Sequence, residues 1–110
     1  MFNVYLICAE FDGKRLYKIG YTRRSVEKRI KEFKTGNGSD IYLIDSFKSK
    51  WGTKIESSLH RKYKENRISG EWFYLSDQDI KEFKHICELY HKNFEIISNE
   101  NLYFLEKGKF

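Results

Sequence analysis

Apolar and β-branched residues dominate two segments near the start of the chain. Residues 2–9 and residues 16–21 both have the composition of buried strands. Between them, residues 11–14 are Phe-Asp-Gly-Lys, and an Asp-Gly pair between two apolar runs is typical of a tight hairpin turn. The pattern therefore predicts an antiparallel β-hairpin over residues 2–21.

The pairing of this hairpin decides which side chains share a face of the sheet. If residue 9 faces residue 14, Tyr5 pairs with Lys18, and both then lie on one face together with the bare backbone of Gly20. The opposite face would carry an apolar set, Val4, Leu6, Cys8, Tyr17 and Ile19. A slip of one residue would break up both sets.

Helical spacing begins after the hairpin. Ser25 is a suitable N-cap and Gly36 a suitable stop for a helix between them, with its lysines on the solvent side. Residues 41–48 alternate well enough to predict a third strand.

The C-terminal half is predicted to be mainly helical. One helix is expected from residue 52 or 53 to about 66, and another begins at the capping sequence of residues 76–79. Residues 1–92 would form one domain, and residues 93–110 would add a strand, a hairpin or a tail packed on it.

Composition and cysteine usage limit the class of protein. A chain of 110 residues with 40% hydrophobic residues and no proline is typical of one folded domain. Cys8 and Cys87 lie in separate apolar patterns without metal-ligand spacing, which predicts buried free thiols and a reducing, cytoplasmic compartment. No apolar run reaches the length that spans a membrane, so no membrane partner is expected.

The chain is basic, with a formal net charge of +5, and this favours polyanionic partners. Lysine and arginine cluster within residues 14–34, and the candidate nucleic-acid contacts there are Arg23, Arg24, Lys28 and Lys31. For any single lysine, a solvated helix face with interspersed glutamates is an equally good interpretation.

Four residues in chain order carry the main chemical hypothesis. Tyr5 and Gly20 come from the hairpin, Arg29 from the first predicted helix and Glu56 from the second. A phenol handles protons, a guanidinium holds a phosphate, and a carboxylate holds a metal ion. Such a set is suited to phosphodiester cleavage.

Short motifs around these residues resemble those of a known family. They are Val4-Tyr5, Lys18-Ile19-Gly20-Tyr21-Thr22, Arg29, Glu56-Ser57-Ser58-Leu59-His60 and Glu71-Trp72-Phe73. The ordered combination resembles the GIY-YIG nuclease superfamily. It is most similar to the compact branch found in phage proteins and in the meiotically up-regulated gene family, over roughly residues 3–75.

This resemblance implies an α+β fold with a three-stranded antiparallel sheet flanked by helices, and cleavage with a single Mg²⁺ or Mn²⁺ ion. Tyr5 would help to activate the attacking water, Arg29 would hold the scissile phosphate, and Glu56 would bind the metal. Gly20 matches the motif glycine.

The chain departs from the superfamily pattern at two positions. Lys18 stands where many members have a second tyrosine, and Phe33 stands where several have histidine. Lys18 is usual in the compact branch, and as a point charge it would stabilise the phosphoryl group in the transition state. Tyr21 and His60 are candidates for the missing hydroxyl or base. His60 is also a candidate N–H donor supporting Glu56, and Glu71 is a candidate for ordering the helix end or pairing with Arg67.

Three functions are compatible with these observations. The first is a metal-dependent endonuclease acting on nucleic acid, with DNA favoured over RNA by family analogy alone. The second is a catalytically degenerate nucleic-acid-binding module, for which Lys18 at a tyrosine position is the discriminating feature. The third is a phage-type interaction or inhibitor protein. In a chain this short, a protein partner or a homodimer would supply targeting.

Overall fold

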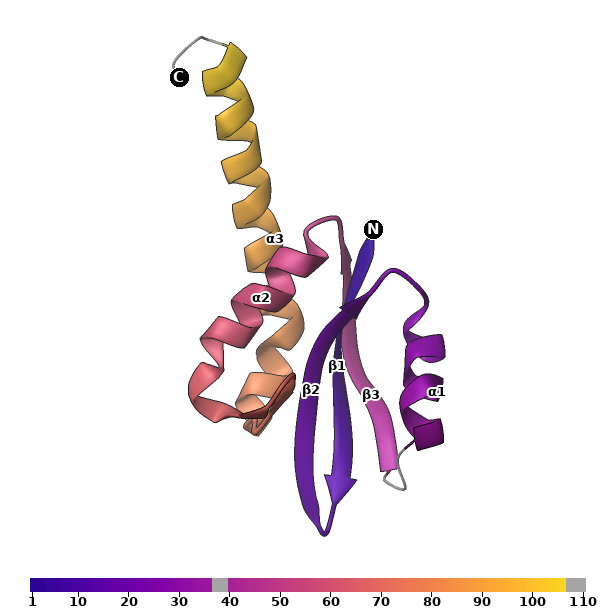
Figure 1. The fold of residues 1–110 in the computed structure, drawn as a ribbon. Helices are drawn as coiled ribbons and strands as arrows, with labels where there is room; N and C mark the ends of the chain where they lie inside the picture. Colours follow the sequence, from indigo (N-terminus) through magenta and orange to yellow (C-terminus); the bar gives the residue numbers. More distant parts are fainter. Residues whose placement is uncertain (37–39, 107–110) are drawn as a thin grey trace.

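Helices and strands alternate along the first half of the chain, and one long helix ends it (Figure 1). The computed structural model describes residues 1–36 and 40–106. The strands are β1 (Phe2–Phe11), β2 (Lys14–Thr22), β3 (Asp40–Ser49), β4 (Arg67–Ser69) and β5 (Trp72–Phe73). The helices are α1 (Val26–Gly36), α2 (Gly52–Lys62) and α3 (Asp77–Glu106), with a short 3₁₀ turn at Lys64–Asn66.

All strands join one antiparallel sheet in the order β3-β1-β2-β5-β4. The α+β class agrees with the sequence, but the expected three-stranded sheet is wrong, because β5 and β4 add to the free edge of β2. These two strands have only 2 and 3 residues, which is too short for an alternating pattern to develop.

The hairpin register differs from the predicted one by two residues. Asp12 and Gly13 both have positive φ values, 48° and 76°, as a two-residue type I′ turn requires. This turn pairs Tyr5 with Gly20, where Tyr5 with Lys18 was expected. Since side chains alternate with a period of two, the shift leaves every residue on its predicted face.

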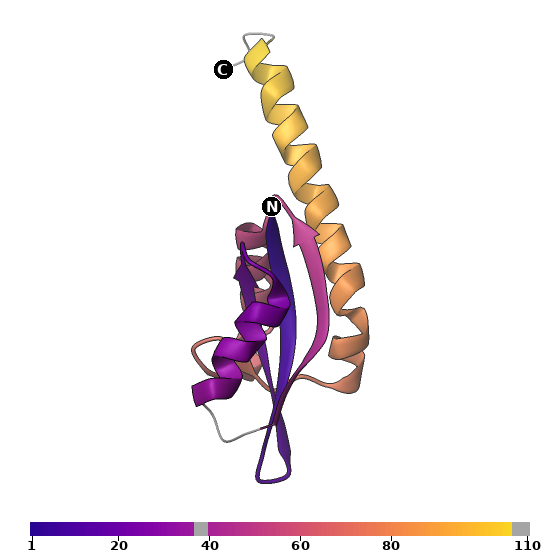
Figure 2. The ribbon, with the colours of Figure 1, turned by 90° about the vertical axis from the view of Figure 1, so that its right-hand side faces the viewer.

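Each face of the sheet buries its own apolar cluster. On one face Tyr5, Ile7 and Ala9 pack with Val26 and Ile30 of α1. On the other face an apolar set from β1 and β2 packs against α2 and α3, including Val4, Leu6, Ile19, Ile55, Leu59 and Phe83. Figure 2 shows α1 and α3 on opposite faces of the sheet. Cys8 and Cys87 are both buried and free, as predicted.

The capping sequence before α3 forms as expected. The Ser76 hydroxyl accepts a hydrogen bond from the Asp79 N–H at 3.1 Å, and the Asp79 carboxylate accepts one from the Ser76 N–H at 3.0 Å. Among the described residues, no helix combines the length and apolarity needed to cross a membrane.

Helix α3 is longer than the sequence pattern indicates. The strand or hairpin expected from residue 93 is wrong, because the helix continues without a break to Glu106 and projects beyond the sheet (Figure 1). The start of this segment does pack on the domain, through Phe94 against the core and Glu95 with Trp51. The chain has no proline, and no glycine interrupts it between Gly70 and residue 108, so nothing ends the helix earlier. Residues 107–110 of that expectation lie outside the described part of the chain.

The two halves of α3 should contribute unequally to stability. Phe83 is 1% exposed, and Phe83→Ala should lower the free energy of unfolding by about 3–5 kcal/mol through loss of core packing. Ile97 is 53% exposed, and Ile97→Ala serves as the matched control with little expected effect. Urea unfolding of both variants measures this. A loss at Ile97 as large as the loss at Phe83 would contradict the projecting helix.

Candidate active site

Tyr5 and Gly20 form the floor of the site. They face each other across β1 and β2, and the Tyr5 side chain is only 1% exposed. A Cβ atom at position 20 would lie 2.5 Å from the Tyr5 hydroxyl oxygen, closer than packed atoms can approach. The phenol therefore lies over bare backbone, which explains why this strand position is a glycine.

Arg29 reaches the same place from α1. The Ser25 hydroxyl accepts a hydrogen bond from the Lys28 N–H at 3.3 Å and caps this helix. One turn into α1, the Arg29 side chain lies close enough to the Tyr5 hydroxyl to interact with it. Burial raises the pKa of Tyr5, and the interaction with Arg29 acts in the opposite direction.

Arg29 also belongs to a small network on the surface of α1. Its Nη1 atom lies 2.9 Å from Glu32 Oε2, and Arg24 Nη2 lies 2.6 Å from Glu32 Oε1. One carboxylate therefore bridges two arginines. Both pairs are partly exposed, so each contributes little to stability.

Lys18 lies at the centre of the arrangement. Its Nζ atom donates to Glu71 Oε2 at 2.6 Å, and its side chain is only 11% exposed. The same ammonium lies 5.2 Å from the Phe33 ring centroid and 5.5 Å from that of Trp72. Two aromatic faces and a carboxylate therefore hold the cation in place. Lys18 and Phe33 are thus in contact.

Three metal-ligating side chains converge beside this ion pair. Glu56, His60 and Glu71 each offer a ligand atom, and these atoms lie within 4.8 Å of one another. Glu56 and His60 are one turn apart on α2, and Glu71 immediately precedes β5. The edge of β2 connects these segments: the Ile19 N–H donates to the Glu71 carbonyl at 3.1 Å, and His60 Nε2 lies 2.8 Å from the Ile19 carbonyl oxygen.

The contact with Ile19 fixes the protonation of the His60 ring. A carbonyl oxygen accepts only, so Nε2 carries the proton in this hydrogen bond. In the neutral ring Nδ1 is then left with a free lone pair. Such a backbone-oriented imidazole is the usual state of a metal-ligating histidine.

The raised pKa of Glu56 indicates that a bound cation would be favourable at this position. Burial raises the pKa of Glu56 to about 7, and the charge of Glu71 and a hydrogen bond with it act in the same direction. Lys18 acts in the opposite direction but is engaged by Glu71. A divalent cation would replace the proton and relieve the repulsion, and two carboxylates with an imidazole nitrogen are a suitable donor set for Mg²⁺ or, better, Mn²⁺.

The phenol, the guanidinium and the carboxylates come together at the β2 edge of the sheet, although α1 and α2 cover opposite faces. The charges of both Glu71 and Glu56 raise the pKa of Tyr5, while Arg29 lowers it, so all of these groups are close enough to interact. The structure therefore brings together the predicted residues Tyr5, Lys18, Gly20, Arg29, Glu56, His60 and Glu71.

Tyr21 is not part of this group. It pairs with Val4 and so lies on the opposite face of the hairpin, where its ring packs edge-on against Phe2 at 5.7 Å. The predicted nucleic-acid contacts Arg23, Arg24, Lys28 and Lys31 are all exposed near the start of α1. The sequence did not identify Phe33 and Trp72 as the walls around Lys18, because β5 is too short to predict its pairing with β2.

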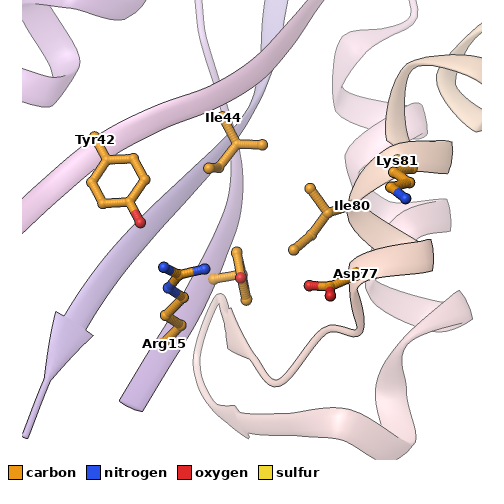
Figure 3. A pocket seen from close by; sticks show the side chains of 7 residues that line it. Arg15, Tyr42, Ile44, Asp77, Ile80 and Lys81 are labelled. Carbon is orange, nitrogen blue, oxygen red and sulfur yellow. The ribbon is translucent and has the colours of Figure 1, made fainter. Parts of the chain in front are cut away.

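A separate cavity of about 230 Å³ lies between strands β2 and β3 and the start of α3 (Figure 3). Ile44 and Ile80 point toward each other across it, and Arg15, Tyr42, Asp77 and Lys81 surround them (Figure 3). Tyr17 completes the lining, and this residue belongs to the face opposite Tyr5. The cavity contains none of the site residues named above.

One comparison with known proteins is informative. A family model described as the T5orf172 domain matches residues 3–95, a span that contains every residue of the cluster. No curated protein and no solved structure matches the chain.

The contact between Tyr5 and Gly20 can be tested by a double-mutant cycle. Gly20→Ala should lower the free energy of unfolding by about 1–3 kcal/mol, because its methyl group overlaps the phenol. In the Tyr5→Ala background the space is open, so the same substitution should cost much less. Urea unfolding of the four proteins measures the coupling. Equal losses in both backgrounds would show that the phenol does not lie over residue 20.

The raised pKa of Glu56 predicts an unusual pH dependence of folding. Its carboxyl binds a proton more tightly in the folded protein, with a pKa of about 7 against an ordinary value of 4.5. The stability that this group contributes is therefore fully present below about pH 4.5 and is lost as the pH rises through about 7. Glu56→Gln should remove this loss, so metal-free urea unfolding over this pH range should favour the variant increasingly as the pH rises. A pH-independent difference between the two proteins would contradict the burial of Glu56 beside Glu71.

Proposed function

The chain belongs to the T5orf172 domain family, a phage-associated group, and we propose that it is a metal-dependent endonuclease of the GIY-YIG type. The observation that carries the proposal is the cluster at the β2 edge, where a phenol, a guanidinium and two carboxylates meet. Each comes from a different segment of the chain, and together they provide the groups that phosphodiester hydrolysis requires.

The metal would be held by Glu56 with Glu71 and the free nitrogen of His60. A bound Mg²⁺ or Mn²⁺ ion supplies positive charge beside the scissile phosphate and makes water a better nucleophile. The protein's part is to keep these ligands at the sheet edge, and the two contacts of Ile19 do this.

Arg29 and Tyr5 would act on the phosphate and on the attacking water. Arg29 would neutralise part of the charge that grows on the phosphoryl oxygens. Tyr5 would orient the water, and in its phenolate form it would take the water proton. The interaction with Arg29 favours the phenolate, whereas burial raises the pKa of Tyr5 and opposes it.

Lys18 would have an electrostatic and positioning role. It is a cation bound to Glu71, so it does not accept a proton as a second tyrosine would. Its charge lowers the pKa of Glu56, against the effect of burial, and it would add positive potential where the phosphate binds.

The substrate class is nucleic acid, and DNA is preferred by family analogy alone. The binding-module alternative keeps the same phosphate contacts without turnover, and the absence of a second phenol from the cluster favours it. The interaction-protein alternative assigns no role to Arg29 or Glu56.

Plasmid nicking distinguishes these functions. The wild-type protein should nick supercoiled plasmid with Mn²⁺ or Mg²⁺ and not with EDTA. Glu56→Gln and Arg29→Ala should each reduce the nicking rate by about 100-fold or more, since one removes a metal ligand and the other removes transition-state charge stabilisation. Glu88→Gln is the matched control for Glu56→Gln, because Glu88 is an exposed helical glutamate on α3, away from both sites.

Binding of a labelled DNA duplex in EDTA separates the alternatives. The endonuclease account predicts that Glu56→Gln binds at least as well as the wild type, because a negative charge is removed near the phosphate. Binding without nicking under both metals would favour the binding module, and a lack of both would favour the interaction protein.

A further inference from the structure

A second polar cavity lies at the start of α1, outside the metal cluster. It has a volume of about 450 Å³. Three cationic side chains, three neutral polar side chains, one carboxylate and one valine line it: Arg23, Arg24, Lys48, Asn3, Ser25, Ser46, Glu27 and Val26. Positive charge therefore predominates in its lining, and neutral hydrogen-bonding groups accompany it.

Strand pairing places this cavity on the same face as Tyr5. Asn3 and Tyr5 are two residues apart on β1, and their partners on β3 are Lys48 and Ser46. Paired residues point to the same side, and a two-residue step along a strand spans about 7 Å. Asn3, Lys48 and Ser46 therefore continue the surface on which the phenol lies.

Helix α1 connects the cavity to the candidate active site a second time. Ser25 lines the cavity, and its carbonyl accepts a hydrogen bond from the Arg29 N–H at 3.3 Å. Glu32 joins Arg24 of the cavity to Arg29 of the cluster, at 2.6 and 2.9 Å. Arg24 and Arg29, which belong to the two sites, are thus linked through Glu32 along the start of the helix.

The loop that presents the cavity arginines is held by specific contacts. The Asn3 side-chain amide donates to the Arg24 carbonyl at 3.2 Å, and the Thr22 hydroxyl accepts from the Arg24 N–H at 3.1 Å. The Arg23 guanidinium lies 5.0 Å from the Phe2 ring centroid. Ordered arginines lose less conformational freedom on binding an anion than free ones would.

We propose that this cavity binds a non-scissile phosphodiester of the same nucleic-acid strand, near the bond that the candidate active site would cut. The inference rests on the nucleic-acid binding assumed in the proposed function and adds a binding position to it. Arg23, Arg24 and Lys48 are the phosphate contacts, and the strand runs from this cavity past Arg29 to Tyr5. A single small anion would need only the cavity, whereas the linked cations of the two sites suit a polyanion.

The test uses the full chain and fluorescently labelled single-stranded and duplex oligonucleotides in EDTA, over a range of salt concentrations. Lys48→Gln and Arg23→Gln remove one charge each. Lys92→Gln is the matched control, because Lys92 is exposed on α3, away from the cavity. Circular dichroism checks that all variants fold.

Each cavity variant should reduce the slope of log affinity against log salt by about one, with a weaker affinity at low salt, while Lys92→Gln leaves both unchanged. Cleavage assays should show a raised KM with kcat retained, because the cavity does not touch the scissile phosphate. Slopes equal to that of Lys92→Gln would overturn the proposal. Displacement of the oligonucleotide by inorganic phosphate at comparable affinity would also overturn it, since the cavity would then be a small-anion site.

The outcome is separable from the endonuclease proposal. If the wild type nicks plasmid while both cavity variants bind like the control, the inference fails and the endonuclease stands. If no protein nicks while the slopes change as expected, the binding position stands and the endonuclease fails.

Discussion

The ion pair between Lys18 and Glu71 is the interaction on which the candidate active site depends. It joins the central strand β2 to the short segment before β5, across 53 residues of sequence, at 2.6 Å. Without this cation, Glu71 would face Glu56 as a second uncompensated carboxylate in a half-buried position. With it, both carboxylates lie beside the His60 ring, with one ligand atom of each residue within 4.8 Å of the others, and the sheet edge gains the geometry of a cation site.

The same ion pair explains why Lys18 and Phe33 occur together. Phe33 covers the Lys18 ammonium, and its ring also lies 6.4 Å from the ring of Tyr5. In the superfamily that the chain resembles, these two positions often carry a tyrosine and a histidine. Here a cation and an aromatic ring fill the same space. The proposed endonuclease therefore replaces a second proton-handling group with fixed positive charge, and it depends more strongly on Tyr5 for proton transfer.

Sequence reasoning predicted the strand faces and the ordered set of site residues, because both follow from local patterns. The hairpin register was wrong by two residues, since the sequence did not distinguish a four-residue loop from the two-residue turn at Asp12-Gly13. Strands β4 and β5 were missed because pairing between Lys18 and Trp72 is non-local. Because these strands were not predicted, the aromatic contacts around Lys18 were not predicted either. The position of Lys48 in the cavity was missed for the same reason, since it depends on non-local pairing with Asn3. The extent of α3 was missed because polar residues interrupt its apolar pattern without breaking the helix.

The most direct measurement is the anomalous diffraction of crystals soaked with Mn²⁺. The account predicts one peak bounded by the carboxylates of Glu56 and Glu71 and by the His60 ring, at the β2 edge within reach of Tyr5 and Arg29. A fully occupied peak elsewhere, with the Glu56 carboxyl still bound to Glu71, would contradict the central claim that these residues form one metal and phosphate site.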